Sequence, residues 1–462
     1  MDSERLVRMF EYIEEKDLNL HSLLIVRNGY LVSEAYFDPY TRDTAHFAAC
    51  ITKSVMGILT GIAIERGYIN SIDEPVLGFF PNRPIANMDA RKQSMQLKHL
   101  LSLTPGLSCK DMLGSDAEMQ KSKDWIQYTL DLPMISEPGA HFTYCSPAVH
   151  LLSAIIQRQT GLSAREFANE QLFMPLGIAP VPVERWPSDP NGISMGYGLQ
   201  LAPRDMAKLG YLYLNRGKWH NRQIVSPDWV AVSTTRHSTW EEEAKRDYGY
   251  LFWLFSGDGY YSAMGLGGQQ IHTAPDKNMV VVVTAGLSPR AEDYIRELMR
   301  DYILPAAASN SALPANPRVA EQLAWAVRRA GGLPRPVPAL PEVARQVSGK
   351  TYKLEHNPFG WQTFSFSFSD DKVTASFTVN GLGELAVGLD DQFRITELPG
   401  PSRLALKGYW ERGDAFVIEA TYLDGPARST LKVTFVGSEI NATLQDTIFG
   451  GPPVYLRGTS QD

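Results

Sequence analysis

The sequence predicts an α/β (α+β) domain, in which an antiparallel sheet is flanked by helices, followed by a smaller all-β domain. The chain has 462 residues, too many for one typical hydrophobic core, so two domains are expected. Helical and strand patterns alternate as far as residue 305, and the next forty or so residues are rich in Pro, Ala and Ser. We therefore expect one domain at 1–305, a linker with one helix at 306–345, and a β domain at 346–462.

The first domain is predicted to open with a helix and a hairpin. Apolar residues at helical spacing predict an amphipathic helix over residues 3–15. Residues 22–27 and 30–37 have strand patterns, and Asn28-Gly29 lies between them. This pair suits a type I′ turn, whose two central residues need positive φ.

The rest of the first domain alternates between predicted helices and strands. Helices are expected near 51–66, 97–103, 124–129, 147–161, 203–212 and 291–303, and strands at 248–255, 269–273 and 279–284. These strands are expected to return to the sheet that the hairpin begins.

Short strand patterns dominate the C-terminal part of the chain. They include residues 363–368, 404–409, 416–420 and 431–435. This spacing is typical of an antiparallel barrel or sandwich of about 115 residues.

Composition and charge narrow the classes of function and location. The net charge is −7 without a Lys or Arg run, so nucleic acid is not an expected partner. No apolar run approaches the ~20 residues of a membrane span. The first residues lack the apolar stretch of a signal peptide, which predicts a cytoplasmic protein as written, or a periplasmic or secreted one if a leader was removed. Three cysteines are too few for a disulfide framework, and we expect free thiols.

A cysteine and a lysine three residues apart are the strongest chemical signal. Cys50 and Lys53 open a predicted apolar helix, and this spacing places both side chains on one face. Burial favours a neutral amine at Lys53, whereas the helix N-terminus and a nearby ammonium favour a thiolate at Cys50. The pair therefore predicts a nucleophile with a proton-transfer partner.

Two further segments carry polar or glycine-rich patterns of the same kind. Tyr144 and Ser146 lie directly before a predicted helix. Residues 265–269, Gly-Leu-Gly-Gly-Gln, open a predicted strand, where two glycines let a substrate approach the backbone closely.

Together these segments resemble the S-x-x-K, Y-x-N and K-T-G elements of β-lactamase-like serine hydrolases, a family that includes class C β-lactamases, penicillin-binding-protein-like esterases and nylon-oligomer hydrolases. Cys50 stands at the family's serine, Ser146 at its asparagine and Leu266 at the lysine of K-T-G. The resemblance covers residues 15–305 and includes the segments 98–101, 174–177 and 203–210. The β-rich tail resembles the lipocalin-like barrels attached to some of these hydrolases.

The resemblance implies roles for individual residues. Cys50, Lys53 and Tyr144 would be catalytic, and the N–H groups of Cys50 and Gln269 would form the oxyanion hole. Leu266 in place of the lysine that engages a β-lactam carboxylate argues against efficient β-lactamase action. Residues expected to contact substrate are Ser146, Leu266, Gly267, Gly268, Trp253 and Tyr248.

Aromatic and histidine residues are further candidates for the site. Aromatic residues near the predicted site could line an acyl pocket, and about half of them are expected in the core; they are Trp125, Tyr248, Tyr250, Trp253, Tyr260 and Tyr261. The histidines at 46, 99, 141 and 272 lack metal-ligand spacing, so no metal or organic cofactor is expected.

The function expected from these features is hydrolysis of an ester or amide, of the carboxylesterase, amidase or peptidase type, through an acyl-enzyme on Cys50. The substrate would be a small ester or amide or a peptide. Two alternatives remain open: transfer of the acyl group to an amine, and non-catalytic binding of an acyl ligand or peptidoglycan fragment. Cys50 is a native nucleophile, a replacement for serine that slows turnover, or the mark of a domain that has lost catalysis. The oligomeric state stays open.

Overall fold

The computed structural model describes residues 1–109, 114–241, 246–289, 291–370, 372–399, 402–446 and 450–461. The chain divides into two compact units, each described here by itself. Unit 1 comprises Met1–Leu23, Ser33–His46 and Val283–Asp462, and unit 2 comprises Leu24–Val32 and Phe47–Val282. The domain limits expected at 305 and 345 stay a prediction.

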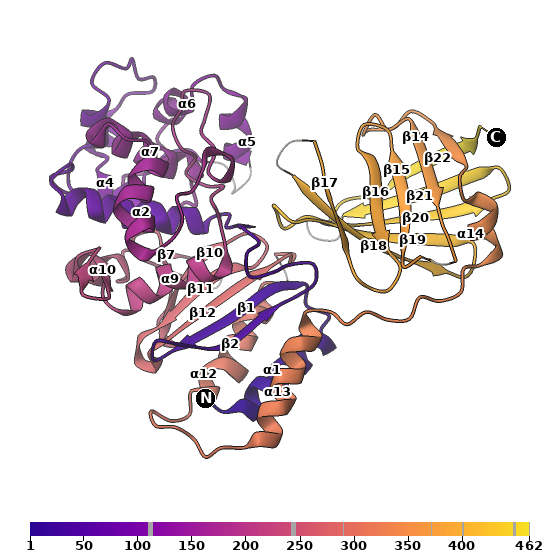
Figure 1. The fold of residues 1–462 in the computed structure, drawn as a ribbon. Helices are drawn as coiled ribbons and strands as arrows, with labels where there is room; N and C mark the ends of the chain where they lie inside the picture. The colour runs from indigo at the N-terminus through magenta and orange to yellow at the C-terminus, as the bar shows by residue number, and fades with distance from the viewer. Residues whose placement is uncertain are drawn as a thin grey trace. The chain divides into compact units, whose positions relative to one another are not determined.

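Among the described residues, eight strands form one sheet in the order β2-β1-β12-β11-β10-β9-β8-β7 (Figure 1). Their bounds are β1 Leu20–Arg27, β2 Tyr30–Tyr36, β7 Ser238–Trp240, β8 Arg246–Tyr248, β9 Trp253–Phe255, β10 Tyr260–Gly265, β11 Gln269–Ala274 and β12 Met279–Ala285. The predicted hairpin is confirmed: Asn28 and Gly29 join β1 to β2 with φ of 52° and 80°. β11 and β12 are buried along their whole length, as expected for a sheet covered on both faces.

Two details of this sheet differ from the prediction. The strand expected at 248–255 is two short strands, β8 and β9, because the chain reverses between them where Leu251 adopts a φ of 64°. β10 was not predicted at all. It pairs with both β9 and β11 and ends at Gly265, directly before the glycine-rich turn.

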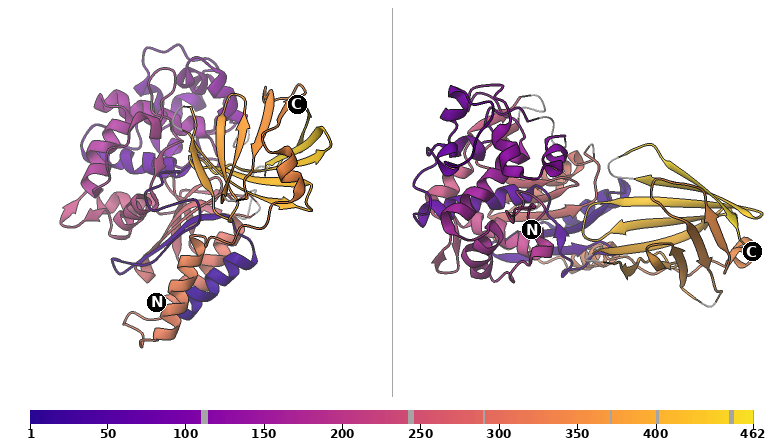
Figure 2. Two further views of the ribbon diagram at one scale, coloured as in Figure 1. Left: turned by 45° about the vertical axis from the view of Figure 1, so that its right-hand side comes forward. Right: turned by 90° about the horizontal axis from the view of Figure 1, so that it is seen from above.

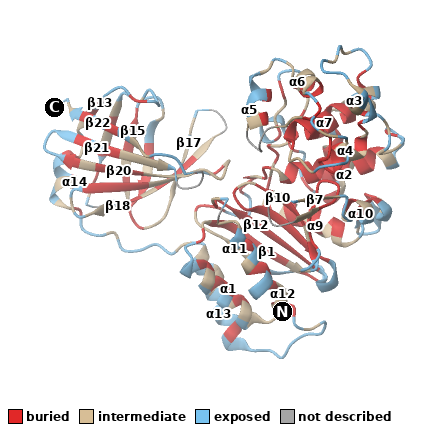
Figure 3. Ribbon diagram, turned by 180° about the vertical axis from the view of Figure 1, so that it is seen from behind, coloured by how far each residue is buried: buried red, intermediate tan, exposed pale blue. Residues whose placement is uncertain are grey.

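Helices of unit 2 pack around α2, Ile51–Glu65. Thirteen consecutive residues of α2, Ile51–Ala63, are buried, which fits a helix that is apolar on every side. α2 packs on α7 and on β10, and Figure 3 shows buried residues in red along these elements. The remaining helices of this unit are α3 Ala90–Ser94, α4 Leu97–Leu101, α5 Gly114–Lys121, α6 Trp125–Asp131, α7 Ser146–Thr160, α8 Ala164–Ala168, α9 Pro203–Leu214 and α10 Pro227–Ser233. α5 was not predicted.

Short helical turns and two-residue strands complete the described elements outside the barrel. The turns are η1 Val76–Phe79, η2 Asn169–Phe173, η3 Met174–Leu176, η4 Val183–Arg185, η5 Pro275–Lys277 and η6 Leu298–Ile303. The short strands pair as β3 His46–Phe47 with β4 Gln200–Leu201, and β5 Lys218–Trp219 with β6 Arg222–Gln223.

Unit 1 contains the terminal helices and the predicted linker helix. The helix predicted at 3–15 is confirmed as α1, Ser3–Glu15, and Asp2 caps it by accepting hydrogen bonds from the N–H groups of Glu4 and Arg5. α1 packs against the linker helix α13, Pro317–Ala330. The other helices are α11 Asp293–Glu297, α12 Leu304–Ala306 and α14 Glu342–Val347.

The described part of the C-terminal region forms a closed barrel of nine strands, β13–β16 and β18–β22, and β17 adds to the side of β18 (Figure 2). A single parallel pair, Gly388 with Lys407, closes the barrel, and the other strand pairs in it are antiparallel. Buried apolar residues alternate with polar ones along β14 (Phe364, Phe366) and β15 (Ala375, Phe377, Val379), which explains the strand pattern of the sequence. The bounds are β13 Thr351–Leu354, β14 Thr363–Ser367, β15 Thr374–Val379, β16 Gly383–Gly388, β17 Arg394–Glu397, β18 Arg403–Glu411, β19 Ala415–Tyr422, β20 Arg428–Val436, β21 Glu439–Asp446 and β22 Val454–Ser460.

The predicted fold class is therefore confirmed: an α/β domain with an antiparallel sheet and helices, followed by a β-barrel rather than a sandwich. In the described parts of the chain, every helix is too short or too polar to cross a membrane.

The close packing of α2 gives a stability prediction. A Cβ at Gly61 would lie 2.3 Å from Cδ1 of Trp229, whose ring is held by a 3.1 Å hydrogen bond from its Nε1 to the carbonyl of Gly57. Gly61→Ala should therefore lower the free energy of unfolding by about 1–3 kcal/mol, although alanine is the better helix former. Urea denaturation measures the effect. Gly78→Ala is the matched control, since a Cβ there meets no atom within 4 Å; equal stabilities of the two variants would contradict the packing argument.

Candidate active site

Cys50 lies at the N-terminal end of α2 as its N-cap residue, and its thiol is partly exposed. The residue before it, Ala49, adopts a φ of 48°, which is costly for a residue with a Cβ. Local contacts hold this turn: the N–H of Ala48 donates to the carbonyl of Leu199 at 2.8 Å, and Thr52 Oγ1 donates to the carbonyl of Ala49 at 2.7 Å. The strained turn presents the sulfur at the end of a rigid, buried helix.

Lys53 is buried, with 1% of its surface exposed, and it reaches back along α2 to Cys50. Its Nζ donates a hydrogen bond of 3.4 Å to the Cys50 sulfur. The same Nζ lies 5.1 Å from the ring centroid of Tyr144 and 5.8 Å from that of Tyr197. The predicted pair thus lies together, and two aromatic faces take the place of water around the amine.

Tyr144 approaches the sulfur from the other side. It lies just before α7, and its hydroxyl hydrogen-bonds the side chain of Cys50. Burial raises the pKa of Tyr144 well above its usual value, and negative charge at Cys50 raises it further. The hydroxyl therefore keeps its proton at neutral pH and is a donor toward sulfur.

The glycine-rich turn lies against the same end of α2. Gly265 pairs with Gln269 across the β10–β11 hairpin, and the two glycines between them have φ of 85° and 86°. A Cβ at Gly265 would lie 2.5 Å from the carbonyl oxygen of Ala48 and 2.9 Å from the backbone nitrogen of Cys50. Only glycine allows this approach of the hairpin to the nucleophile. The oxyanion role of the Cys50 and Gln269 N–H groups stays a prediction.

The residues expected to contact substrate fall into two groups. The first group belongs to the two motif segments. Ser146 is the first residue of α7 and follows Tyr144 by two residues, and Leu266 lies in the turn between β10 and β11. The second group is aromatic. Trp253 stacks on Tyr144 with ring centroids 5.9 Å apart, and Tyr248 meets Trp253 edge-on at 4.7 Å.

Other aromatic candidates lie in different surroundings. Tyr250 stacks on His237 at 3.8 Å, and Tyr260 stacks on Phe255 at 4.6 Å. Both are buried core residues. Aromatic residues that the sequence did not single out complete the wall beside Trp253, namely Phe142 and Trp240.

Asp116 is a titratable group at the site that was not predicted. It lies in the first turn of α5, hydrogen-bonds Ser146 and lies within electrostatic range of Lys53. Burial raises the pKa of Asp116, while Lys53 and Ser146 act in the opposite direction. No spacing relates Asp116 to the Cys50–Lys53 pair, so the sequence offered no signal for it.

The expectation of free thiols was wrong for two of the three cysteines. Cys109 and Cys145 form a disulfide, and Cys50 is the free cysteine. Three cysteines are too few for a framework of several disulfides, but they are enough for a single bridge. The bridge matters to the site because Cys145 lies between Tyr144 and Ser146, while Cys109 belongs to the segment that leads to Asp116.

Among the residues that the structure describes, no group of three or more His, Cys, Asp or Glu side chains could hold a metal ion. His272 instead hydrogen-bonds Ser262 at 2.6 Å inside the sheet, and burial lowers its pKa to about 3.

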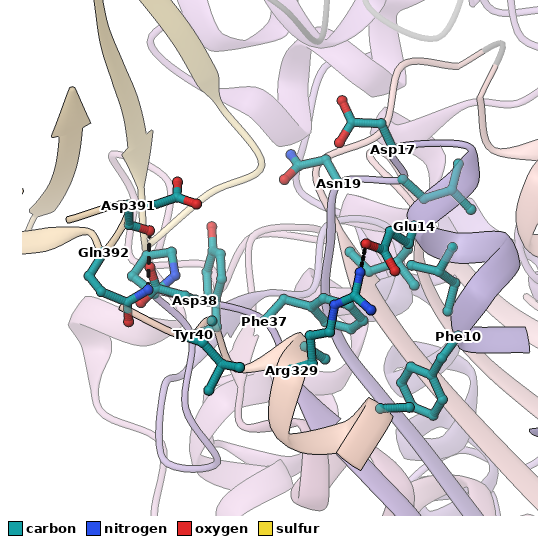
Figure 4. Close-up of a pocket in the computed structure, with 18 of the residues that line it drawn as sticks. Phe10, Glu14, Asp17, Asn19, Phe37, Asp38, Tyr40, Arg329, Asp391 and Gln392 are labelled. Atoms are coloured by element: carbon teal, nitrogen blue, oxygen red, sulfur yellow. Dashed lines mark hydrogen bonds and ion pairs between the residues drawn. The ribbon is translucent and has the colours of Figure 1, made fainter. Parts of the chain in front are cut away.

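A large cavity of about 870 Å³ lies in unit 1, and none of the predicted catalytic residues lines it. Figure 4 shows Glu14 paired with Arg329 on one side, Phe37 and Tyr40 in the middle, and Asp391 on the other side. Its lining mixes aromatic rings with both signs of charge. This cavity is distinct from the surroundings of Cys50.

Comparison with known proteins agrees with the fold. The β-lactamase family model matches residues 21–304, and the chain belongs to the β-lactamase family. The resemblance noted in the sequence is thereby confirmed.

Named relatives cover hydrolysis and acyl transfer. The chain is 23% identical to the 6-aminohexanoate-dimer hydrolase of Paenarthrobacter ureafaciens over 286 residues, 56% of this chain and 71% of the relative. It is 28% identical to the monacolin J acid methylbutanoyltransferase of Aspergillus terreus over 159 residues, 30% of this chain and 38% of the relative. An octameric penicillin-binding protein homologue from Pyrococcus abyssi has a similar fold, with a TM-score of 0.53, 18% identity and coverage of 99% of this chain and 100% of that chain.

The Cys109–Cys145 disulfide is predicted to stabilise the folded protein independently of Cys50. The bridge joins residues 36 apart, so its loss should lower the free energy of unfolding by about 2–4 kcal/mol. Dithiothreitol should lower the denaturation midpoint of the wild-type protein, and Cys109→Ser should have the lower midpoint with or without reductant. A further drop of the same size when Cys109→Ser is reduced would show that another bond is responsible.

Proposed function

We propose that this chain hydrolyses a small ester or amide through a covalent acyl-enzyme on Cys50, with the cysteine as the native nucleophile. One observation carries the proposal: Lys53 Nζ and the Tyr144 hydroxyl both hydrogen-bond the same partly exposed sulfur. A thiol held by two proton-carrying groups at a helix N-terminus has the surroundings of an activated nucleophile. Family membership supports an enzyme of the hydrolase or acyltransferase kind.

In the proposed reaction, the Cys50 thiolate attacks the acyl carbon, and the carbonyl oxygen becomes an oxyanion. The backbone N–H groups of Cys50 and Gln269 are the proposed donors to this oxygen. Collapse of the intermediate expels the leaving group and forms a thioester. Water then attacks the thioester, and Tyr144 and Lys53 are the proposed proton-transfer groups at the sulfur.

The surroundings of the sulfur also point to the kind of acyl group. The wall of Trp253, Tyr248 and Phe142 beside Tyr144 is apolar and aromatic, and Leu266 adds no charge. We infer an acyl group with an apolar or aromatic part rather than a β-lactam carboxylate.

The first test is the time course of nitrophenol release from a short nitrophenyl ester. Sustained turnover is expected for the wild-type protein and loss of turnover for Cys50→Ala, with a thioester adduct of the intact protein seen by mass spectrometry. Tyr144→Phe should lower kcat by about 10²–10⁴-fold, the usual contribution of a proton-transfer group. Tyr213→Phe is its control, because this buried hydroxyl lies 3.4 Å from Ser233, which is not a predicted site residue.

Other outcomes of this test distinguish the remaining interpretations of Cys50. A single burst that stalls, with steady turnover by Cys50→Ser, would identify a serine hydrolase whose nucleophile is exchanged. Saturable binding of the ester without adduct or turnover would identify a binding protein and overturn the proposal.

Acyl transfer is the second candidate function, favoured by the similarity to a methylbutanoyltransferase and by the reactivity of thioesters toward amines. If transfer occurs, adding a primary alkyl amine to the ester reaction should produce an amide while nitrophenol release continues. Product analysis by mass spectrometry measures the ratio of amide to free acid. Free acid alone, at amine concentrations that do not inhibit turnover, would exclude transfer to amines.

A further inference from the structure

Asp116 is an acidic side chain near the Cys50–Lys53–Tyr144 cluster that the proposed reaction does not use. α5, which carries it, packs on α6 and α7. Its carboxyl group hydrogen-bonds the hydroxyl of Ser146, and its Oδ1 is buried without a hydrogen-bond partner among the described residues. A buried carboxylate oxygen without a partner is unfavourable, so the protonated acid is stabilised at this position.

The groups that face Asp116 come from several elements. They are Lys53 from α2, Tyr128 from α6, Ser146 from α7, and Tyr144 and Tyr197 from loops. The charge of Asp116 raises the pKa of Tyr128, Tyr144 and Tyr197, after the larger effect of burial on each. Lys53 pulls the carboxyl toward the ionised form and burial pulls it toward the acid. The net effect is a pKa of the carboxyl group above its usual value.

Ser146 is the hydrogen-bond partner of this carboxyl group and is itself expected to contact substrate. It is the residue after Cys145 and two residues after Tyr144, and 3% of its surface is exposed. A hydroxyl group can accept a proton from one neighbour and donate its own to another, whereas an amide at the same place cannot relay a proton in this way. A serine backed by a carboxyl group thus has a capacity that an asparagine lacks.

We propose that Asp116, acting through the hydroxyl of Ser146, supplies the proton that an amine leaving group needs when this site cleaves an amide. The inference rests on the proposed function. A thiolate leaves a tetrahedral intermediate more easily than an amide anion does, so a cysteine enzyme cleaves amides only if the nitrogen is protonated as it departs. Asp116 is a positioning and proton-holding residue rather than a catalytic one, because Ser146 lies between it and the substrate.

In the first half of the proposed reaction, the Cys50 thiolate forms the C–S bond to the amide carbon. As the C–N bond breaks, the nitrogen takes the proton of the Ser146 hydroxyl, and the Asp116 carboxyl group replaces that proton and becomes a carboxylate. Water then adds its hydroxide to the thioester carbon and returns its proton through Ser146 to Asp116. The C–S bond breaks, and acid, amine and thiolate are left.

The test compares two substrates with the same acyl group, a nitrophenyl ester and an n-butyl amide. Nitrophenolate departs without a proton, so Asp116→Asn should leave kcat for the ester within about threefold and lower kcat for the amide by about 100-fold. Ser146→Ala should also slow amide cleavage more than ester cleavage, but its ester kcat should fall as well, because Ser146 is an expected substrate contact. The variant with both substitutions should cleave the amide only slightly more slowly than either single variant, because Asp116 and Ser146 act in one proton path. Glu118→Gln, on the exposed side of α5, is the matched control and should change neither rate.

Each result decides between explanations. Equal losses on ester and amide in Asp116→Asn would assign a purely structural role and overturn the inference. Unchanged amide cleavage in that variant would overturn it as well, and so would efficient ester turnover with no amide cleavage by the wild-type protein. Absence of ester turnover in the wild-type protein would instead overturn the proposed function, which is a separate failure.

Discussion

The burial of the Lys53 amine is the constraint on which the rest of the site depends. Removing a lysine amine from water is costly unless other groups replace the solvent. Here the replacement is the sulfur of Cys50 and the faces of Tyr144 and Tyr197. Each of these residues comes from a different segment, so the long-range fold of unit 2 is required to bring them to one amine.

The same constraint explains why α2 is apolar on all sides. A helix whose residues are mostly apolar after its first turn must bury them against neighbours, and α7, β10 and Trp229 provide them. Small residues, including Gly61, let these neighbours come close. The rigid helix then fixes the distance between Lys53 and Cys50, and the reactive group is held by packing rather than by loops.

Local patterns made much of the fold predictable. The α1 helix, the hairpin at Asn28-Gly29 and the buried α2 follow from periodicity and turn preference, which act over a few residues. The Cys50–Lys53 contact was predictable for the same reason, since residues three apart on a helix are neighbours. The break between β8 and β9 was not, because it depends on a positive φ at Leu251, which has no sequence signature.

The parts of the site that depend on contacts between distant segments could be predicted only from the family resemblance, or not at all. Tyr144 was found because its surroundings resemble a family motif. Asp116 and Tyr197 come from loop-rich segments with no periodic relation to Lys53, and the Cys109–Cys145 bridge depends on a spatial proximity that three cysteines cannot reveal. Substitutions at motif positions, such as Ser146 and Leu266, show where the chemistry departs from the family but not which distant side chain compensates.

The two kinds of sulfur in unit 2 make opposite demands on the cellular environment. The Cys50 nucleophile that we propose needs a reduced, unmodified sulfur, whereas the Cys109–Cys145 bridge exists only while its two sulfurs are oxidised. Cys145 is fully buried and Cys50 is partly exposed, so oxidants reach the nucleophile more readily than the buried end of the bridge. The proposed activity therefore needs redox conditions under which Cys50 stays reduced while the bridge stays oxidised. Storage, purification and the cellular compartment differ in how well they meet this condition.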